Sequence, residues 1–181
     1  CSGNDEFEPC SANSTVTIKS TIKCSDFTKY YKNTASYFAT FYDKKGKLLK
    51  NTQVKIKLNG KTYSIKTNAK GVGKLAVDLK PGKYDISLIN SQTSETIKKS
   101  VTIKSLIEAN DLTFNETKKG KFIVKILNSY GKASPNKKIT VKVNGKTYSA
   151  KTDKNGTASI TLSLDAGTYT ATTEYNGEKK S

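Results

Sequence analysis

The sequence predicts an all-β protein with two tandem β-sandwich domains, and three observations support this fold class. The hexapeptide NGKTYS at residues 59–64 recurs at 144–149, an offset of 85 residues. The same offset carries VTIKS at 16–20 onto VTIKS at 101–105 without any insertion. Between these landmarks, apolar and polar residues alternate with a period of two, which is typical of half-buried strands. A constant offset over several landmarks indicates one structural unit used twice.

The repeat defines the expected domain organisation. Domain 1 is predicted over residues 16–100 and domain 2 over residues 101–181, after an extended leader over residues 1–15 that matches no part of the repeat. Both domains have the usual length of small domains. The hydrophobic content of 34% favours two small domains over one large core. No run of about 18 apolar residues is present, so we expect no transmembrane segment.

The second repeat shows the expected strands and turns in order. Strands are predicted over five segments: 122–127, 139–143, 146–152, 158–164 and 168–175. Asn144-Gly145 joins the second to the third, and this dipeptide predicts a type I′ hairpin, which needs positive φ at both central residues. Turns at 153–156 and 166–167 separate the later strands. Short strands at such intervals are typical of a β-sandwich.

A family resemblance adds to this prediction. The succession YGKASPNKKITVKVNGKTYSAKTDKNGTASITLSLDAGTYTATTEYNG at 130–177 resembles the bacterial immunoglobulin-like repeats of large surface adhesins. It is especially similar to the Lys-, Thr- and Asn-rich repeats of adhesin-like proteins from methanogenic archaea. The first repeat carries the same succession at 45–92. The resemblance implies immunoglobulin-like β-sandwiches that serve mostly as stalks and spacers, and it implies no particular ligand.

The charge of the chain suggests two interpretations. The net charge is +17, and all 32 basic residues are Lys. Because Arg supplies the bidentate contacts to bases and phosphates, its absence argues against specific nucleic-acid recognition. The first repeat contains 18 lysines with five acidic residues, and the second contains 14 with seven. These lysines are either solvated groups on exposed strand faces or a means of attraction to a polyanionic surface such as a cell wall, a mucin or a membrane headgroup.

The sequence predicts no enzyme, cofactor or metal site. It contains no His, the commonest general base and imidazole ligand. Asp153, Asn155 and Gly156 faintly resemble a calcium loop, but the further carboxylates that Ca²⁺ requires are missing, so we expect a plain turn. Asp26 and Asp111 occupy equivalent positions in the two repeats, which favours a shared loop cap over a shared active site.

The three cysteines all lie near the start of the chain, at Cys1, Cys10 and Cys24. Their spacings fit no common zinc finger. In an extracellular setting two of them should pair. We expect a Cys10–Cys24 disulfide that ties the leader to domain 1, with a Cys1–Cys10 pair as an alternative. Cys1 is followed by Ser-Gly-Asn-Asp, which resembles the start of a mature lipoprotein, and it is therefore a candidate for lipidation.

Three N-x-S/T sequons are candidate N-glycosylation sites on a secreted surface. They begin at Asn13, Asn115 and Asn155. Such sequons also arise easily in a chain rich in Asn and Thr, so they add little to the functional prediction.

The end of the second repeat suggests a mode of assembly. In the first repeat the segment SETIKKSVTIK at 94–104 can return as a last strand, whereas the second repeat stops near the equivalent point. A sandwich without this strand exposes an apolar groove and unpaired backbone groups. We expect Val16 and Ile18 of one subunit to fill the groove of the next, as Val101 and Ile103 do within domain 1. The alternative is a trimmed C-terminus.

These observations favour an extracellular, cell-surface structural or adhesive protein. It is predicted to be an adhesin stalk or a filament subunit, whose partners are copies of itself joined head to tail. The alternative function is a Lys-rich binding module for anionic cell-wall or host glycans. Salt dependence separates the two, because electrostatic binding weakens steeply with salt.

Overall fold

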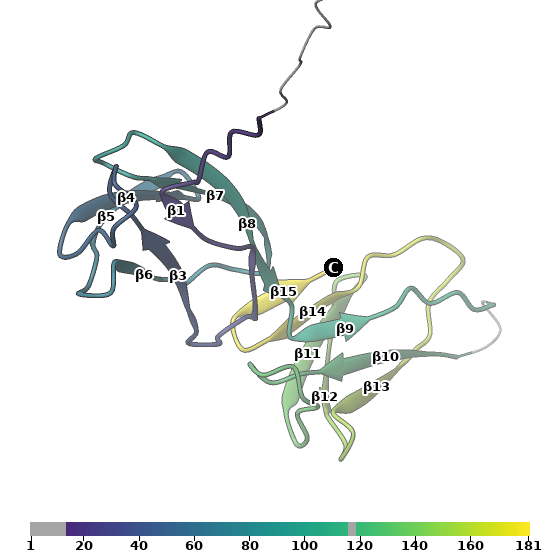
Figure 1. Cartoon of the computed structure of the whole chain (residues 1–181). Helices are drawn as coiled ribbons and strands as arrows, with labels where there is room; N and C mark the ends of the chain where they lie inside the picture. Colours follow the sequence, from purple (N-terminus) through teal and green to yellow (C-terminus); the bar gives the residue numbers. More distant parts are fainter. Residues whose placement is uncertain (1–13, 116–118) are drawn as a thin grey trace, which may run out of the picture.

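The computed structural model describes residues 14–115 and 119–181, and these residues form strands and turns without any helix (Figure 1). The first half contains eight strands: β1 (Ile22–Lys23), β2 (Phe27–Tyr30), β3 (Ser36–Phe41), β4 (Gln53–Leu58), β5 (Lys61–Lys66), β6 (Val72–Ala76), β7 (Gly82–Ile89) and β8 (Thr96–Lys104). The second half contains β9 (Ile107–Ala109), β10 (Gly120–Ile126), β11 (Lys138–Val143), β12 (Lys146–Lys151), β13 (Thr157–Leu162), β14 (Thr172–Tyr175) and β15 (Glu178–Lys180).

Domain 1 is a sandwich of two sheets. One sheet has the order β1-β3-β6 and the other has the order β2-β8-β7-β4-β5. All pairings are antiparallel except that of β2 with β8, which is parallel. Alternation places one face of each strand inside, so that Phe41, Ile56 and Leu88 are fully buried between the sheets while Lys55 and Lys57 are exposed.

Domain 2 repeats this arrangement with fewer strands. One sheet has the order β9-β10-β13, and the facing sheet has the order β12-β11-β14-β15. The core again comes from alternating positions, such as Val124, Ile126 and Val141, which are fully buried. Within the described residues no strand corresponds to β2, and β15 corresponds only to the beginning of β8.

The strand arrangement is that of an immunoglobulin-like sandwich. In domain 1, β3 and β6 of one sheet face β4, β7 and β8 of the other, and the connections give the strand order of that fold. Each domain also has a tyrosine corner, near the start of β7 in domain 1 and three residues before β14 in domain 2, where a phenol donates to a backbone carbonyl four residues upstream. The distances are 2.9 Å from Tyr84 Oη to Lys80 O and 3.1 Å from Tyr169 Oη to Asp165 O. The predicted fold class is confirmed.

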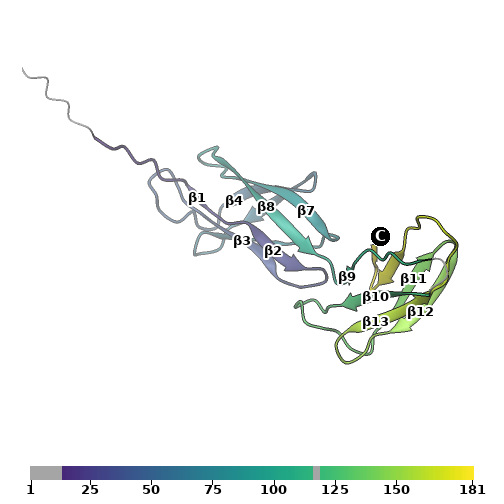
Figure 2. The same ribbon diagram turned by 90° about the vertical axis from the view of Figure 1, so that its right-hand side faces the viewer.

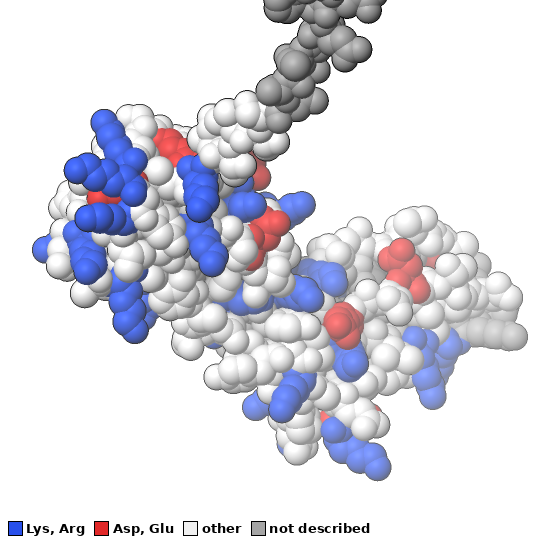
Figure 3. Space-filling view, viewed as in Figure 1, with Lys and Arg blue, Asp and Glu red and all other residues white. Residues whose placement is uncertain are grey.

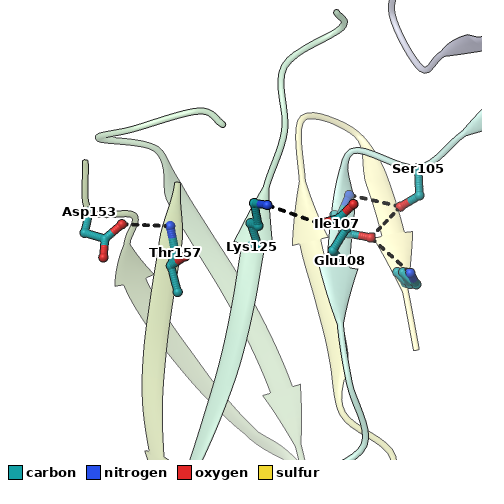
Figure 4. A network of polar contacts seen from close by, with 7 residues as sticks. Ser105, Ile107, Glu108, Lys125, Asp153 and Thr157 are labelled. Carbon is teal, nitrogen blue, oxygen red and sulfur yellow. Dashed lines mark hydrogen bonds and ion pairs between the residues drawn. The ribbon is translucent and has the colours of Figure 1, made fainter. Parts of the chain in front are cut away.

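The predicted turns are present as well. Asn59 and Gly60 have φ of 49° and 73°, and Asn144 and Gly145 have φ of 47° and 72°, as a type I′ hairpin requires. At the predicted turn after β12, Asp153 Oδ1 accepts the backbone N–H groups of two following residues, one of which is Thr157 at 2.9 Å (Figure 4). The faint calcium loop is therefore a turn stabilised by its own backbone, as expected.

The boundary between the domains differs from the repeat boundary. We expected domain 2 to begin at Val101, but β8 continues to Lys104, and Val101 lies in the core of domain 1. The connection to β9 is only Ser105-Leu106, and Leu106 is 1% exposed in the same core. The repeated sequence unit therefore begins inside the last strand of the preceding sandwich.

The two sandwiches follow one another end to end and are in direct contact (Figures 1 and 2). The ring of Tyr30 lies so close to Gly131 that a Cβ on this glycine would come within 2.3 Å of it. Asn33 Nδ2 donates to the carbonyl of Ser129 at 2.8 Å. Tyr175 packs against both hydrophobic cores. A two-residue connection and these contacts join the two domains directly.

A buried threonine at the same position of each domain permits a stability test. Thr67 Oγ1 donates to Leu49 O, and Thr152 Oγ1 donates to Ser134 O at 2.7 Å; both side chains are almost completely buried. We expect Thr67→Val and Thr152→Val each to lower the free energy of unfolding by about 1–3 kcal/mol, because each leaves a buried carbonyl without its donor. Chemical denaturation measures the change, and the exposed Thr62→Val should be nearly neutral.

Candidate strand-acceptor groove

A groove of about 580 Å³ opens at one edge of domain 2. Its walls are two chain segments, 109–114 and 164–171, which lie on either side of it. Phe122, Val143 and Leu162 contribute to its floor from three different strands. All three side chains belong to the core of domain 2, so the groove gives direct access to that core.

The equivalent space in domain 1 is filled by β8. There Val101 and Ile103 are 0% and 2% exposed. Val101 stands between Phe27 of β2 and Tyr84 of β7 in the hydrogen-bonded ladders. With the repeat offset of 85, Phe27 corresponds to Leu112 and Tyr84 to Tyr169. Leu112 and Tyr169 line opposite sides of the groove. The groove of domain 2 is thus the counterpart of the site that holds the end of β8.

The two walls are extended segments without the strand structure of their counterparts. We expected a strand over 168–175, but β14 begins only at Thr172, and residues 112–115 form no strand. In domain 1, residues 82–85 of β7 pair only with β8, and β2 pairs only with β8. Both segments are strands there because β8 supplies their hydrogen bonds. In domain 2 the corresponding segments line the groove and have no ladder partner among the described residues.

The start of the missing strand is nevertheless present. We expected domain 2 to lack its last strand, but β15 pairs with β14 through Glu178, Lys179 and Lys180. Lys180 stands opposite Thr173, as Ile97 stands opposite Leu88 in domain 1. Three residues of the last strand are therefore in place, and the groove begins beyond them.

One wall position distinguishes this groove from the site in domain 1. Lys29 of β2 is buried, and its Nζ donates to the carbonyls of Asn33 and Val77; burial lowers its pKa. The corresponding residue is Phe114, which lies over Gly120 so closely that a Cβ there would be 2.3 Å from the ring. Phe114 gives the groove an apolar wall where domain 1 has a cation.

The proposed donor residues lie at the other end of the molecule and are exposed. Val16 is 84% exposed and Ile18 is 91% exposed, in a segment over 14–20 that forms no strand. A β-branched residue so exposed gains about 1.5–3 kcal/mol when it is fully buried. The structure does not bring Val16 and Ile18 into contact with the groove of the same chain, because they precede domain 1 and the groove lies in domain 2.

A carboxylate fixes the backbone immediately after this segment. Glu95 Oε2 accepts the backbone N–H of Thr21 at 2.6 Å, and Glu95 Oε1 accepts the hydroxyl of Ser20 at 2.6 Å. In domain 2 Glu178 accepts the equivalent groups, the hydroxyl of Ser105 and the backbone N–H of Leu106. Ile107 O lies 2.8 Å from the same Ser105 Oγ and accepts a hydrogen bond from Lys180 Nζ at 3.0 Å (Figure 4).

These two glutamates were not identified in the sequence. They are 83 residues apart, not 85, because the hairpin between β14 and β15 is two residues shorter than its counterpart between β7 and β8. The hairpin signal Asn176-Gly177, with φ of 48° and 78°, would have revealed the shorter turn. Counting from the end of each hairpin, Glu95 and Glu178 would then have been recognised as equivalent.

The shared loop cap is present in domain 1. Asp26 Oδ1 accepts the backbone N–H of Ser100 in β8 at 2.8 Å, and this hydrogen bond lowers the pKa of Asp26. Its equivalent, Asp111, is exposed and lines the groove. The aspartate that binds the middle of the last strand in domain 1 therefore lies at the groove in domain 2.

The remaining sequence candidates lie away from the groove or outside the described residues. Cys24 is half-buried beside Tyr37, and burial raises the pKa of its thiol. Cys1, Cys10 and Asn13 lie outside the described residues, so the disulfide and the lipid anchor stay predictions. Of the other sequons, Asn115 and Asn155 are exposed.

Metal and membrane sites were also sought in the described part of the chain. No group of three or more His, Cys, Asp or Glu residues that could bind a metal ion occurs within residues 14–115 and 119–181. Across the same residues, no helix has the length and apolar character needed to span a bilayer.

Comparison with known proteins gives structural neighbours only. No family model matches the sequence, and no curated protein matches it. Similar solved structures include invasin, a bacterial integrin-binding protein, with 16% identity, 90% of this chain and 37% of invasin covered, and a TM-score of 0.38. The BSP domain of a biofilm-associated protein has 14% identity over 88% of this chain and 28% of that chain, with a TM-score of 0.32.

A third neighbour is a Ca²⁺-stabilized adhesin with which an Antarctic bacterium binds ice. It has 16% identity over 86% of this chain and 48% of that chain, with a TM-score of 0.32. The chain spans less than half the length of each of these three proteins. Likenesses at this level do not extend to a ligand, an activity or a partner of this chain.

The carboxylate of Glu95 predicts a pH dependence. Hydrogen bonds from Ser20 and Thr21 lower the pKa of Glu95. A group whose pKa is lower in the folded state contributes stability above its unfolded pKa, and this contribution is lost as the pH falls through the folded pKa. We expect Glu95→Gln to lower the free energy of unfolding at pH 7 and to have much less effect near pH 3. The exposed Asp85→Asn is the control, and an equal loss at both pH values would contradict the assignment.

Proposed function

We propose that the protein is an extracellular, cell-surface structural subunit that assembles head to tail, with the segment Val16–Lys19 of one copy completing domain 2 of the next. This function includes no catalytic step. It accounts for an adhesin stalk or a filament, in which rigid sandwiches provide length. The observation that carries the proposal is that one pentapeptide, VTIKS, occurs twice in the chain, and its two copies have opposite environments.

The second copy of the pentapeptide supports the choice of occupant. At 101–105 its Val and Ile are buried in the site that the groove corresponds to, whereas at 16–20 the same side chains are exposed. The groove and the exposed segment therefore match in sequence as well as in polarity. Strand addition of this kind obtains affinity from main-chain hydrogen bonds and specificity from the alternate side chains that enter pockets.

The register follows from domain 1. Val16 takes the place of Val101, between Leu112 and Tyr169. Ile18 takes the place of Ile103 and lies beside Phe114. Antiparallel pairing with residues 167–170 and parallel pairing with residues 112–115 convert both groove walls into strands.

The incoming strand continues β15 without overlap. Lys180 occupies the position of Ile97, and Ser181 therefore occupies that of Lys98. By the repeat offset, Ser14 corresponds to Lys99. The donor begins where β15 ends. Residues before Ser14 do not need to match the last strand of domain 1.

The cap and the anchor support the same register. Thr15 corresponds to Ser100, so its backbone N–H comes to the carboxylate of Asp111, as that of Ser100 does to Asp26. After Lys19, the hydrogen bonds of Glu95 fix Ser20, as those of Glu178 fix the start of domain 2. The donor segment thus precedes domain 1 in the same way that the end of β8 precedes domain 2. Such a heterologous contact does not close on itself and builds a filament.

A synthetic peptide tests the acceptor. A variant that lacks residues 1–19 retains the groove but cannot donate, and we expect it to bind a peptide of residues 14–20 measured by fluorescence anisotropy. Val16→Asp or Ile18→Asp in the peptide should weaken binding by at least about 100-fold, because the burial energy is lost and a charge enters the core. Thr17→Gln is the matched control, since its counterpart Thr102 points away from the core.

Assembly of the full chain tests the filament. We expect the full chain to form concentration-dependent polymers in sedimentation and electron microscopy, and Val16→Asp with Ile18→Asp to leave a folded monomer. Asp111→Ala should shorten the polymers. Undiminished assembly of the double variant would overturn the proposal. So would native material in which residues following Ser181 fill the groove.

A further inference from the structure

Domain 1 carries lysines on the outer face of its larger sheet. In this sheet Lys57 of β4 stands opposite Ser87 of β7, and Ser87 stands opposite Lys98 of β8, so two lysines flank one serine in a row across three strands. Lys55 lies two residues along β4 on the same face, and Lys66 stands at the edge, in β5. All four lysines are exposed. Figure 3 shows lysine side chains gathered over this domain. We call Lys55, Lys57, Lys66 and Lys98 the lysine face.

Among residues 14–115 and 119–181, these lysines have no acidic partner within ion-pair distance. All three ion pairs among the described residues lie in domain 2. The acidic residue of this face, Asp85, stands opposite Ser100 and is exposed. Ser87 lies between Lys57 and Lys98, and Thr62 and Ser64 of β5 stand opposite Lys57 and Lys55. On β7, the apolar Ile89 stands opposite Lys55.

On the same face of domain 2, lysines form ion pairs with a carboxylate. There Lys142, the counterpart of Lys57, lies 3.2 Å from Glu174, and Lys179 lies 3.1 Å from the same carboxylate. Hydrogen bonds from Lys179 and Lys142, together with their positive charges, lower the pKa of Glu174. The counterpart of Glu174 in domain 1 is Ile89. Domain 2 also has no lysine at the counterparts of Lys55 and Lys98, which are Thr140 and Ser181.

The spacing of the charges indicates the class of ligand. Residues two apart on a strand are about 7 Å apart, and alternate strands are about 9.6 Å apart. Long Lys side chains at such spacings fit an extended chain of repeated anionic groups better than one small anion. The hydroxyl groups between them can donate to and accept from sugar hydroxyls. The absence of Arg disfavours base readout, and no aromatic side chain for base stacking lies among these four lysines.

We infer that the lysine face of domain 1 is a binding surface for an anionic polysaccharide that carries carboxylate, sulfate or phosphate groups. The surface is independent of the groove in domain 2, and it provides the protein with an attachment site. Domain 2 does not share it, because Thr140 and Ser181 stand at the positions of Lys55 and Lys98, and Glu174 pairs with Lys142, the counterpart of Lys57.

The test uses the full chain with Val16→Asp and Ile18→Asp, so that assembly does not alter the apparent affinity. The probes are heparin, dextran sulfate, polygalacturonate and a poly(glycerol phosphate), each measured by calorimetry at several salt concentrations. We expect Lys55→Gln with Lys57→Gln and Lys98→Gln to weaken binding of at least one probe about tenfold at low salt and to reduce its salt dependence. Ile89→Glu alone should weaken the same binding about three- to fivefold.

The matched control removes the same charge from domain 2. Lys138→Gln, Lys146→Gln and Lys151→Gln change three exposed lysines that form no ion pair. We expect less than a twofold effect. An equal loss in the two triple variants would show a net-charge effect and overturn the proposal. So would failure to bind every polysaccharide probe, or tighter binding of double-stranded DNA than of all four probes. Whichever probe is retained best identifies the anionic group.

Discussion

The last strand of each sandwich supplies the hydrogen bonds that two neighbouring segments need in order to form strands. In domain 1, β8 is the only partner of β2 and the only partner of the first half of β7. A strand without a partner leaves its backbone donors and acceptors to water, and this favours irregular structure. The two domains show both outcomes for nearly the same sequence pattern. Where β8 pairs with its neighbours, they are strands, and the corresponding segments of domain 2, which have no such partner among the described residues, are not.

The sequence was sufficient for most of the fold. Period-two alternation, the Asn-Gly hairpins and the constant offset predicted the strands and the sandwich, because these depend on local chemistry and on burial of one face. The extent of the strand after residue 168 was not predictable in this way. Its residues have good strand propensity, but a strand also needs a hydrogen-bonding neighbour, and that neighbour is set by tertiary pairing.

The candidate site was predictable in part for the same reason. The repeat identified Val16 and Ile18 as copies of Val101 and Ile103, since identical sequence at a constant offset implies equivalent positions. It could not show that Lys180 already occupies the place of Ile97, because a hairpin two residues shorter changes the offset. The glutamate anchors were hidden by the same change. A constant offset is informative only until the first loop of different length.

Length and attachment are linked in this molecule by its geometry. The two-residue connection, the contact of Tyr30 with Gly131 and the anchor at Ser105 together hold each domain in a fixed direction from the previous one. If each junction between copies repeats the junction within a copy, every domain 1 along a filament presents its lysine face at a regular interval. A long polysaccharide can then engage several such faces at once. Each contact after the first is intramolecular and depends on effective concentration, so weak individual sites give strong overall attachment. Electrostatic contacts of this kind are weakened by salt, whereas the proposed burial of Val16 and Ile18 in the groove is not, so under the two proposals we expect salt to release the ligand while the filament stays assembled.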